Sequence, residues 1–488
     1  MIHIRAHGYS RLKRLLVAVL GWSGILAFAG LFAIFTAQHL SEGLALSGVV
    51  LVGSVLLVRG SMLTDTLSLR WIPVAWVALF LSADERFMGL GRSPLEAAQG
   101  NASVGNLVQI AIYGLVALMI FRTRRALLER NRFRIPKLPI LLYPAFALAS
   151  TVWSLTLIFT LVRASQLLII VALALLMVRV WQSSPETGQA LWRDTLTAFV
   201  QLVTILTLVG FSVGWPAGRF TWPGAHPGIA ATYAGAAFLI LLARGRLQAP
   251  PPQWAYFPRL LLLALVLFLG QTRSVLAALA FAILAMLWSL GREKPIARYL
   301  GIWYYGVGVT LTLLFARLQL VDYLARGESS QQLDTLSGRT TLWEFAIHDV
   351  SRAGKTIMGF GYGAERVVLF PQVDWTSTAH NSWIEALLGV GMIGVCLLAA
   401  VVFFLVWRYG WASDPNPDAR LSFGILAYLL VISGFSETIA LPGIGFGLLI
   451  LISVPALGKW KRFPSESMLS DDPHQSTPGL RPVVRVRR

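Results

Sequence analysis

The chain has 488 residues, of which 56% are hydrophobic and 13% are charged, about half the charged share of an average soluble domain. Apolar runs near the ~20 residues that cross a bilayer recur from end to end, which excludes a soluble globular protein. The net charge of +18 would suggest nucleic-acid binding in a soluble protein. Cytoplasmic loops of membrane proteins also collect Lys and Arg, so we expect no nucleic-acid partner.

The apolar runs predict an all-α fold, a polytopic transmembrane bundle of about 12–14 helices. A basic N-terminus leads into the first run without a small-residue cleavage signal, which favours a retained helix over a secretory peptide. The single cysteine, Cys396, excludes an internal disulfide and a cysteine metal cluster. In chain order, the predicted spans cover residues 15–38, 44–58, 66–82, 104–121, 138–157, 165–181, 195–214, 228–243, 258–271, 274–290, 299–316, 383–407, 420–436 and 440–457.

The basic residues sort the predicted loops between the two sides of the membrane. With a cytoplasmic N-terminus and alternating spans, about three quarters of the Lys and Arg residues fall on the cytoplasmic side. The segments 122–137, 244–259 and 291–298 are the clearest cytoplasmic anchors. We therefore expect both termini in the cytoplasm.

Three parts of the chain are predicted. Residues 1–137 form N-terminal transmembrane helices, residues 138–458 form a transmembrane core, and residues 459–488 form a disordered cytoplasmic tail rich in Pro and Ser. The core contains a loop, 317–382, that lies on the side opposite the termini. Loops of this length are usually functional or disordered.

The sequence of this long loop indicates ordered structure. Leu342, Phe345, Ala346 and Val350 stand near helical spacing and predict a helix on the membrane surface over a site, or one that merely packs on the bundle. The glycines of GFGYG, residues 359–363, then permit a tight or left-handed backbone.

His380 is the leading catalytic candidate. It stands in TAHNSWIEALLGVGMIG, where a polar loop enters a predicted span. Imidazole titrates near neutral pH and can accept a proton from an attacking hydroxyl. Asn381 and Glu385 are four residues apart, on one helical face, and either could orient the ring or the acceptor. The alternative is an interfacial histidine without a role.

Four cationic candidates fall on the same side as His380. Arg273 lies between two apolar runs with almost no loop, where an arginine either snorkels to the interface or faces the bundle and binds an anion. Arg219 and His226 stand in GWPAGRFTWPGAHPGIA, and Arg339 stands in the long loop. Guanidinium groups that converge there would suit a diphosphate, whose oxygens they bind in bidentate fashion.

Other chemistry has little support in the sequence. It lacks a Walker A loop and a dinucleotide fingerprint, so we expect no ATP, no nicotinamide and no other cofactor. It also lacks an Asp-x-Asp or His-x-x-x-His cluster, so we expect no metal. The carboxylate pair Asp84–Glu85 could bind a metal or act as a base, but a solvated loop end is the favoured interpretation.

Taken together, these motifs resemble a known family. The segment SGRTTLW (residues 337–343), then GFGYG, then AHNSWIEALLGVGMIG resembles the signature region of the O-antigen ligase and O-antigen polymerase superfamily. Upstream, GRFTWPGAHPGIAATYA and GQTRSVLAAL resemble the family's arginine elements. The resemblance covers residues 215–400, and departs from the family at Gly228, where Asn is common, and at Trp383.

The resemblance implies a metal-independent, GT-C-type glycosyltransferase in the bacterial inner membrane, with its site on the periplasmic face. Such enzymes transfer a glycan from an undecaprenyl-diphosphate carrier to an acceptor hydroxyl on a lipid or glycan. By position, His380 resembles the essential histidine of the family, and Arg219 and Arg273 resemble its diphosphate-binding arginines. Arg339 would be a further contact, with His226, Asn381 and Glu385 in support.

Two alternatives stay open at this point. A repeat-unit polymerase for O-antigen or exopolysaccharide differs from a ligase mainly in its acceptor. A polysaccharide or glycolipid transporter would also have many spans and buried cations. Transporters usually bind substrate near the membrane midplane and contain internal repeats, whereas this chain shows no repeat and places its polar residues on one side.

Overall fold

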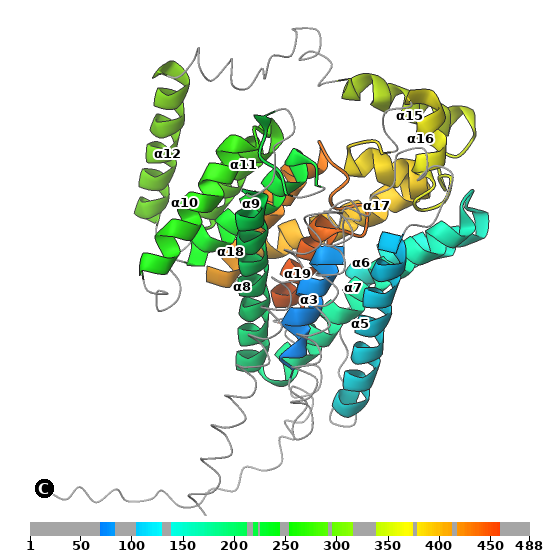
Figure 1. Cartoon of the computed structure of the whole chain (residues 1–488), viewed down its shortest axis with the longest axis horizontal. Helices are drawn as coiled ribbons and strands as arrows, with labels where there is room; N and C mark the ends of the chain where they lie inside the picture. The colour runs from blue at the N-terminus through cyan, green and yellow to red at the C-terminus, as the bar shows by residue number, and fades with distance from the viewer. Residues whose placement is uncertain are drawn as a thin grey trace, which may run out of the picture.

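A computed structural model describes residues 69–82, 104–128, 138–211, 218–222, 225–244, 253–290, 295–315, 338–373, 378–411 and 417–458. Within these ranges the chain forms helices and turns, and no strand (Figure 1). The elements are α3 (Trp71–Ser82), α5 (Val104–Leu128), α6 (Leu138–Ala149), the 3₁₀ turn η2 (Ser150–Trp153), α7 (Leu157–Ser183), α8 (Pro185–Gly210), α9 (Pro227–Arg244), α10 (Gln253–Leu269), α11 (Arg273–Leu290), α12 (Pro295–Phe315), α15 (Arg339–Arg352), α16 (Glu365–Val373), α17 (Ser382–Gly410), α18 (Pro417–Ser433) and α19 (Ile444–Gly458).

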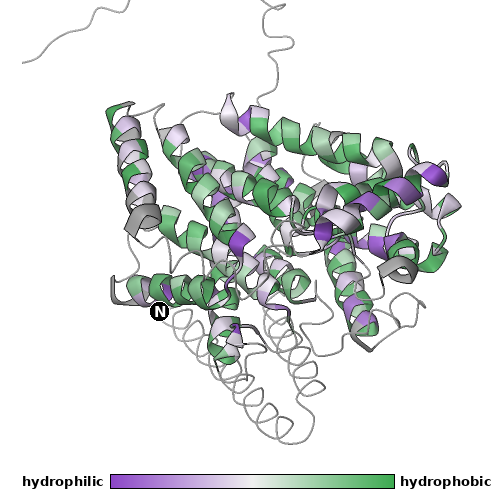
Figure 2. Ribbon diagram, turned by 90° about the horizontal axis from the view of Figure 1, so that it is seen from above, coloured by the Kyte–Doolittle hydropathy of each residue, from purple (hydrophilic) through white to green (hydrophobic). Residues whose placement is uncertain are grey.

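The prediction of an all-α polytopic membrane protein is confirmed. Four helices are long and apolar enough to cross a membrane: Asn106–Thr123 within α5, then α7, α8 and α17. Shorter apolar helices, such as α3, α9, α11 and α19, surround them. Most helices are coloured as hydrophobic in Figure 2. The predicted spans 15–38 and 44–58, the pair Asp84–Glu85 and the tail 459–488 lie outside the described residues, and the division into three parts stays a prediction.

The fifth predicted span, 138–157, is interrupted. Helix α6 ends at Ala149, η2 follows, and α7 begins at Leu157, before the predicted start at 165. The hydroxyl of Ser150 donates to Ala147 O (2.6 Å), and Ser154 Oγ accepts from Thr156 N–H (3.0 Å). Such local hydroxyl bonds compete with the backbone bonds of a helix, and they produce a corner in place of a continuous span.

Helix α19 lies within the bundle. Every residue from Ile444 to Leu457 is buried, as expected of a helix that is hydrophobic all round. Its backbone accepts hydrogen bonds from neighbouring elements, such as that from the Trp192 indole of α8 to Leu451 O (3.0 Å). Gly447 permits close packing because its Cα faces the ring of Phe80.

Helix α17, predicted as one continuous span, is broken at Gly391. This residue has φ 68° and ψ −169°, and a Cβ there would lie 2.2 Å from the carbonyl oxygen of Ile357. Only glycine combines that backbone conformation with so close an approach. The prediction of an uninterrupted helix over 383–407 is therefore wrong at this point.

The segment 356–361 of the long loop fills the break. Four backbone hydrogen bonds join it to α17: Phe360 N–H to Leu388 O (2.8 Å), Gly361 N–H to Gly389 O (2.8 Å), Met392 N–H to Thr356 O (2.8 Å) and Ile393 N–H to Ile357 O (3.3 Å). Backbone groups freed by a helix break must be satisfied within the protein at membrane depth. The loop supplies those partners and is thereby fastened to the bundle.

The helix predicted in the long loop is confirmed as α15, and its position on the membrane surface stays a prediction. Leu342, Ala346 and Val350 are buried at a spacing of four residues, whereas Phe345, expected on the same face, is 43% exposed. Helix α16 follows the glycine segment and was not predicted. Figure 1 shows α15 and α16 beside α17 at one end of the molecule, and both contact it.

The glycine segment adopts the backbone expected of it. Gly359, Gly361 and Gly363 all have positive φ, between 69° and 105°. Their close approaches to α17, to Ser154 and to Phe159, respectively, leave no room for a Cβ. The segment therefore lies between the corner at η2 and the broken helix.

Helix α18 packs antiparallel to α9 and α11. Tyr428, near the end of α18, donates its hydroxyl to Thr232 O near the start of α9 (2.7 Å). Midway along α18, Gly424 lies against Ala282 and Met286 of α11. At the other end of α18, Asp418 contacts Arg193 of α8 at 3.1 Å.

The segment before α9 connects the end of α8 to α10 and α11. Phe220 and Trp222 pack against Gly210, and Phe220 N–H donates to Leu269 O at the end of α10 (3.1 Å). The starts of α9 and α11 therefore share one face of the bundle with the end of α18.

Candidate active site

His380 stands immediately before α17 in a strained backbone conformation. Its φ is 50°, a left-handed value that is uncommon for a non-glycine residue. The ring Nδ1 lies 3.5 Å from Oε2 of Glu437 and 3.5 Å from Oγ1 of Thr378. About 30% of each of the two side chains, His380 and Glu437, is exposed, so the pair is partly accessible.

The start of α17 is tied to the connection between α18 and α19. The Asn381 carboxamide oxygen accepts from Trp383 N–H (2.9 Å) and caps the helix, while its Nδ2 donates to Gly434 O (3.1 Å). Ser382 Oγ donates to Ser436 O (2.7 Å). Asn381 is thus engaged with backbone groups, and these bonds bring the α18–α19 connection, with Glu437, against His380.

Glu385 contacts the backbone before His380. Its Oε2 accepts from Ala379 N–H at 2.8 Å, and the indole of Trp343 in α15 donates to Ala379 O at 2.8 Å. Both polar atoms of the Ala379 backbone are therefore held by side chains from α17 and α15. Glu437 is the acidic residue that faces the ring itself.

A second buried carboxyl belongs to Glu365, the first residue of α16. It is 1% exposed, and neither of its carboxylate oxygens has a hydrogen-bond partner in the described part of the chain. Burial raises the pKa of Glu365 above its ordinary value of 4.5, an effect that the nearby Arg366 guanidinium opposes. Both Arg366 and Arg163 lie over the ring of Phe159, at 5.1 Å and 5.3 Å from its centroid.

Arg219 is attached to the turn that precedes Arg273. Its Nε and Nη2 donate to Gly270 O (3.2 and 2.9 Å), and Nη2 also reaches Thr272 Oγ1 (3.4 Å). The turn contains Gln271 with φ 47° and ends at Arg273, the first residue of α11. The fork of Arg219 thus contacts the turn adjacent to Arg273, with both side chains partly exposed.

His226 caps α9. Its Nδ1 accepts from Gly228 N–H at 3.1 Å, and its side chain is exposed. Accepting that bond assigns Nδ1 as the unprotonated nitrogen. Arg339 begins α15, after Gly338 with φ 82°, and is half-buried in the long loop.

The predicted site residues thus form two groups. His380, Asn381 and Glu385 stand around the entry to α17. Arg219, His226 and Arg273 stand at the starts of α9 and α11, the face that the end of α18 shares. Because Asn381 binds Gly434 at that end, the two groups lie on the same side of the bundle.

Two residues of this region did not emerge from the sequence reasoning, Glu365 and Glu437, and Trp343 emerged only as the last residue of the SGRTTLW motif. Glu437 carried a usable signal, since it is an acid in the short link between the last two predicted spans, on the predicted side of His380. Glu365, in GAERVV, showed no pattern that separates a buried carboxyl from a solvated one.

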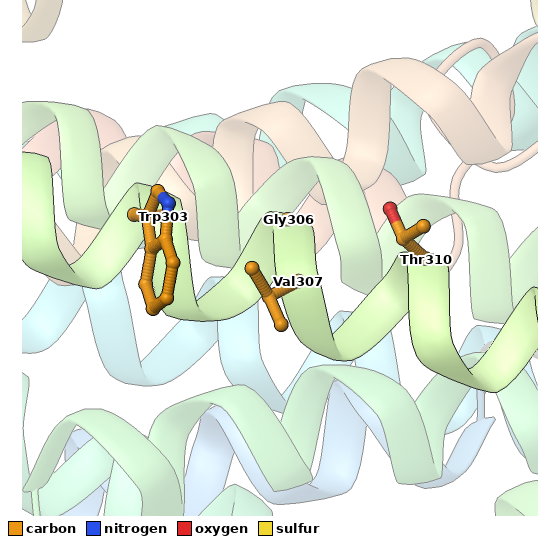
Figure 3. Close-up of a pocket in the computed structure, with 4 residues that line it drawn as sticks. All are labelled: Trp303, Gly306, Val307 and Thr310. Atoms are coloured by element: carbon orange, nitrogen blue, oxygen red, sulfur yellow. The ribbon is translucent and has the colours of Figure 1, made fainter.

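In the described residues, neither a metal-binding cluster nor a pocket indicates a further site. Within the described part of the chain, no group of three or more His, Cys, Asp or Glu side chains could hold a metal ion. A shallow hollow on α12 is lined by Trp303, Gly306, Val307 and Thr310 (Figure 3). It contains no titratable side chain and belongs to neither group of candidate residues.

Comparison with known proteins agrees with this geometry. Residues 259–399, from α10 to the middle of α17, match the family described as O-Antigen ligase. Over these residues the chain is similar to that family. The matched region includes Arg273, Arg339, His380, Glu365 and Glu385.

One curated relative is similar over a shorter stretch. The exopolysaccharide production protein ExoQ of Rhizobium meliloti (strain 1021) is 33% identical over 111 residues, which cover 20% of this chain and 25% of ExoQ. The aligned part therefore spans about a quarter of that relative's length.

Proposed function

We propose that the chain transfers a glycan from an undecaprenyl-diphosphate-linked donor to an acceptor hydroxyl at the periplasmic face of the inner membrane. The observation that carries this proposal is the His380–Glu437 contact at the mouth of α17, on the side of the bundle where Arg219 meets the turn before Arg273. A base and two guanidinium groups are what transfer from a lipid diphosphate requires.

In this mechanism, His380 removes the proton of the acceptor hydroxyl. Nδ1 is directed at Glu437, and Nε2 is the nitrogen that would take the proton of the acceptor. The acceptor oxygen then attacks the anomeric carbon of the donor glycan, the bond to the diphosphate breaks, and the lipid diphosphate leaves with its electron pair. Because a diphosphate is already a good leaving group, the step requires no ATP.

Arg219 and Arg273 stabilise the charge on the departing diphosphate. A guanidinium fork matches phosphate oxygens in bidentate geometry, and preorganised positive charge is most effective where negative charge develops. Arg339 at the start of α15 would be a further contact from the long loop. Membrane lipids surround the carrier chain of the donor.

A repeat-unit polymerase is the second candidate. It uses the same donor chemistry with another lipid-linked glycan as acceptor. The similarity to a protein whose name refers to exopolysaccharide production favours this candidate. The chain length of the product distinguishes the two, since a polymerase extends its product repeatedly.

The test of the proposal is transfer by the purified protein in lipid nanodiscs, without any ion gradient. We expect product from a lipid-diphosphate-linked glycan, and a loss of about 10²–10⁴ in rate for His380→Ala, as general-base catalysis predicts. The variant should still fold and bind the donor. Wild-type-like transfer by His380→Ala would exclude His380 as base, and absence of transfer by the wild type would favour a transporter.

The sidedness has its own test. We expect cysteines placed at Ser329 and Ser465, in a background without Cys396, to react with an impermeant thiol reagent from opposite sides of the membrane. Reaction of both from the same side would contradict a periplasmic loop and cytoplasmic termini.

A further inference from the structure

Two buried carboxyls meet between α16 and α17, and the proposed mechanism uses neither of them. Glu365 is 1% exposed and Glu385 is 2% exposed. Glu365 Oε2 lies 3.7 Å from the position of a Cβ on Gly389, one helical turn beyond Glu385 on the same face. Glu365 therefore reaches the face of α17 that carries Glu385.

This contact requires a proton. Two ionised carboxylates in contact and out of water repel each other, and neither is solvated. In the described part of the chain, both oxygens of Glu365 and Oε1 of Glu385 are buried without a hydrogen-bond partner, and a proton shared between the two carboxyls would supply one. A hydrogen bond between the two groups therefore exists only when one carboxyl is protonated and donates to the other.

The charges around the pair differ between its two members. Glu365 faces the guanidinium groups of Arg366 and Arg163 and stands in the first turn of α16, where the helix dipole favours negative charge. The carboxyls of Glu365 and Glu437 act on Glu385 more strongly than the guanidinium of Arg366 does. The positive surroundings favour an ionised Glu365, and the negative surroundings favour a neutral Glu385.

We propose that Glu385 is a neutral carboxylic acid that positions His380, with its Oε1–H donating to the Glu365 carboxylate and its Oε2 accepting from Ala379 N–H. The inference rests on the proposed function, since it assigns Glu385 to the same site. It makes Glu385 a positioning residue rather than an alternative base.

Glu385 positions the imidazole of His380 through the backbone of Ala379. Ala379 is held through its N–H by Glu385 and through its C=O by Trp343. The next residue, His380, has the unfavourable φ of 50°, and such conformations persist only where the surroundings enforce them. The fixed Ala379 backbone therefore directs the imidazole of His380 towards Glu437.

Substitutions at Glu385 and Glu365 test the assignment by kinetics. Gln at 385 keeps a donor for Glu365 and an acceptor for Ala379, so transfer by Glu385→Gln should stay within about threefold of the wild type. Glu385→Ala loses both bonds and should lower kcat about tenfold or more, with little change in the KM for the donor. Glu365→Gln removes the negative charge that accepts the hydrogen bond, so its transfer rate should lie between those of Glu385→Gln and Glu385→Ala.

The matched control is Glu344→Gln, because Glu344 is an exposed glutamate of α15 outside the site. If Glu385→Gln is as damaging as Glu385→Ala, the ionised carboxylate is what matters at residue 385 and the proposal is overturned.

An infrared measurement tests the proton directly and does not depend on transfer. At neutral pH, the purified full-length protein in nanodiscs should show the C=O stretch of a protonated carboxylic acid. We expect this band to be lost in Glu385→Gln and kept in Glu344→Gln and Glu437→Gln. A band that persists in Glu385→Gln overturns the assignment, whereas a wild type that makes no product would count against the proposed function alone.

Discussion

The imidazole of His380 and the carboxylate of Glu437 face each other across 3.5 Å, although 56 residues lie between them in the chain. The contact joins the entry of α17 to the connection between α18 and α19. It directs Nδ1 of the ring towards Glu437 and is therefore the first contact to remove experimentally.

Glu437→Ala should lower kcat at least about tenfold, because a carboxylate that orients a histidine base also stabilises the imidazolium formed when the base takes a proton. The measurement is steady-state transfer with a lipid-linked donor, with Glu344→Gln as control. Retention of full kcat would show that the ring is oriented without Glu437.

Arg219→Lys and Arg273→Lys should both lose transfer activity, because an ammonium keeps the charge but not the planar fork. Arg219→Lys should also weaken the attachment to the turn at Gly270, which accepts from two nitrogens of the guanidinium. We expect both the KM for the donor and kcat to change. If Arg219→Ala and Arg273→Ala both keep full activity at normal protein levels, the two arginines serve only as interfacial anchors.

Gly391→Ala should destabilise the protein by about 2 kcal/mol or more. Its φ of 68° is unfavourable for alanine, and the added Cβ would lie 2.2 Å from Ile357 O. Gly410→Ala is the control in the same helix, since its nearest neighbours are 3.9 Å away or more. Thermal unfolding of the solubilised variants is followed by size-exclusion chromatography. The unfolding midpoint of Gly391→Ala should be well below that of Gly410→Ala. Equal midpoints would show that the helix break at Gly391 does not require glycine.

Stability should depend on pH through the Glu365–Glu385 pair. In the unfolded chain both carboxyls ionise near the ordinary pKa of 4.5, whereas the buried pair of the proposal keeps one proton, so above about that pH the folded protein binds more protons than the unfolded chain. The free energy of unfolding then falls as pH rises. The contribution is fully present below the unfolded pKa and is lost as pH passes the raised, folded pKa.

The variant Glu385→Gln should flatten this dependence, because an amide has no proton to lose in that range. Unfolding temperatures of the wild type, Glu385→Gln and Glu344→Gln in nanodiscs, measured from weakly acidic to alkaline pH, provide the check. If the unfolding temperature of Glu385→Gln falls with pH as steeply as that of the wild type, the titrating group is not Glu385.

Local sequence was sufficient for several features of the fold. The positions of most described helices follow from apolar runs, and the burial of Leu342, Ala346 and Val350 follows from their spacing. The glycines of GFGYG indicated a tight backbone, which the structure confirms. These features depend on neighbours along the chain, so the pattern alone predicts them.

The local sequence did not predict the helix break at Gly391. GVGMIG reads as part of a continuous span, because glycine is tolerated in membrane helices when the backbone finds other partners. Those partners come from the segment 356–361, some thirty residues earlier, and no pattern within α17 indicates them.

By itself, the sequence determined the membrane class, the positions of most described helices and the candidates His380, Arg219 and Arg273, because hydrophobic runs and isolated polar residues are local properties. Only the tertiary structure decided which acid faces the histidine and which carboxyls share a proton. Glu437 and Glu365 look like ordinary loop acids in the sequence. Their environment arises when helix ends that are distant in the chain pack together, and packing, unlike hydropathy, is not encoded at any single position.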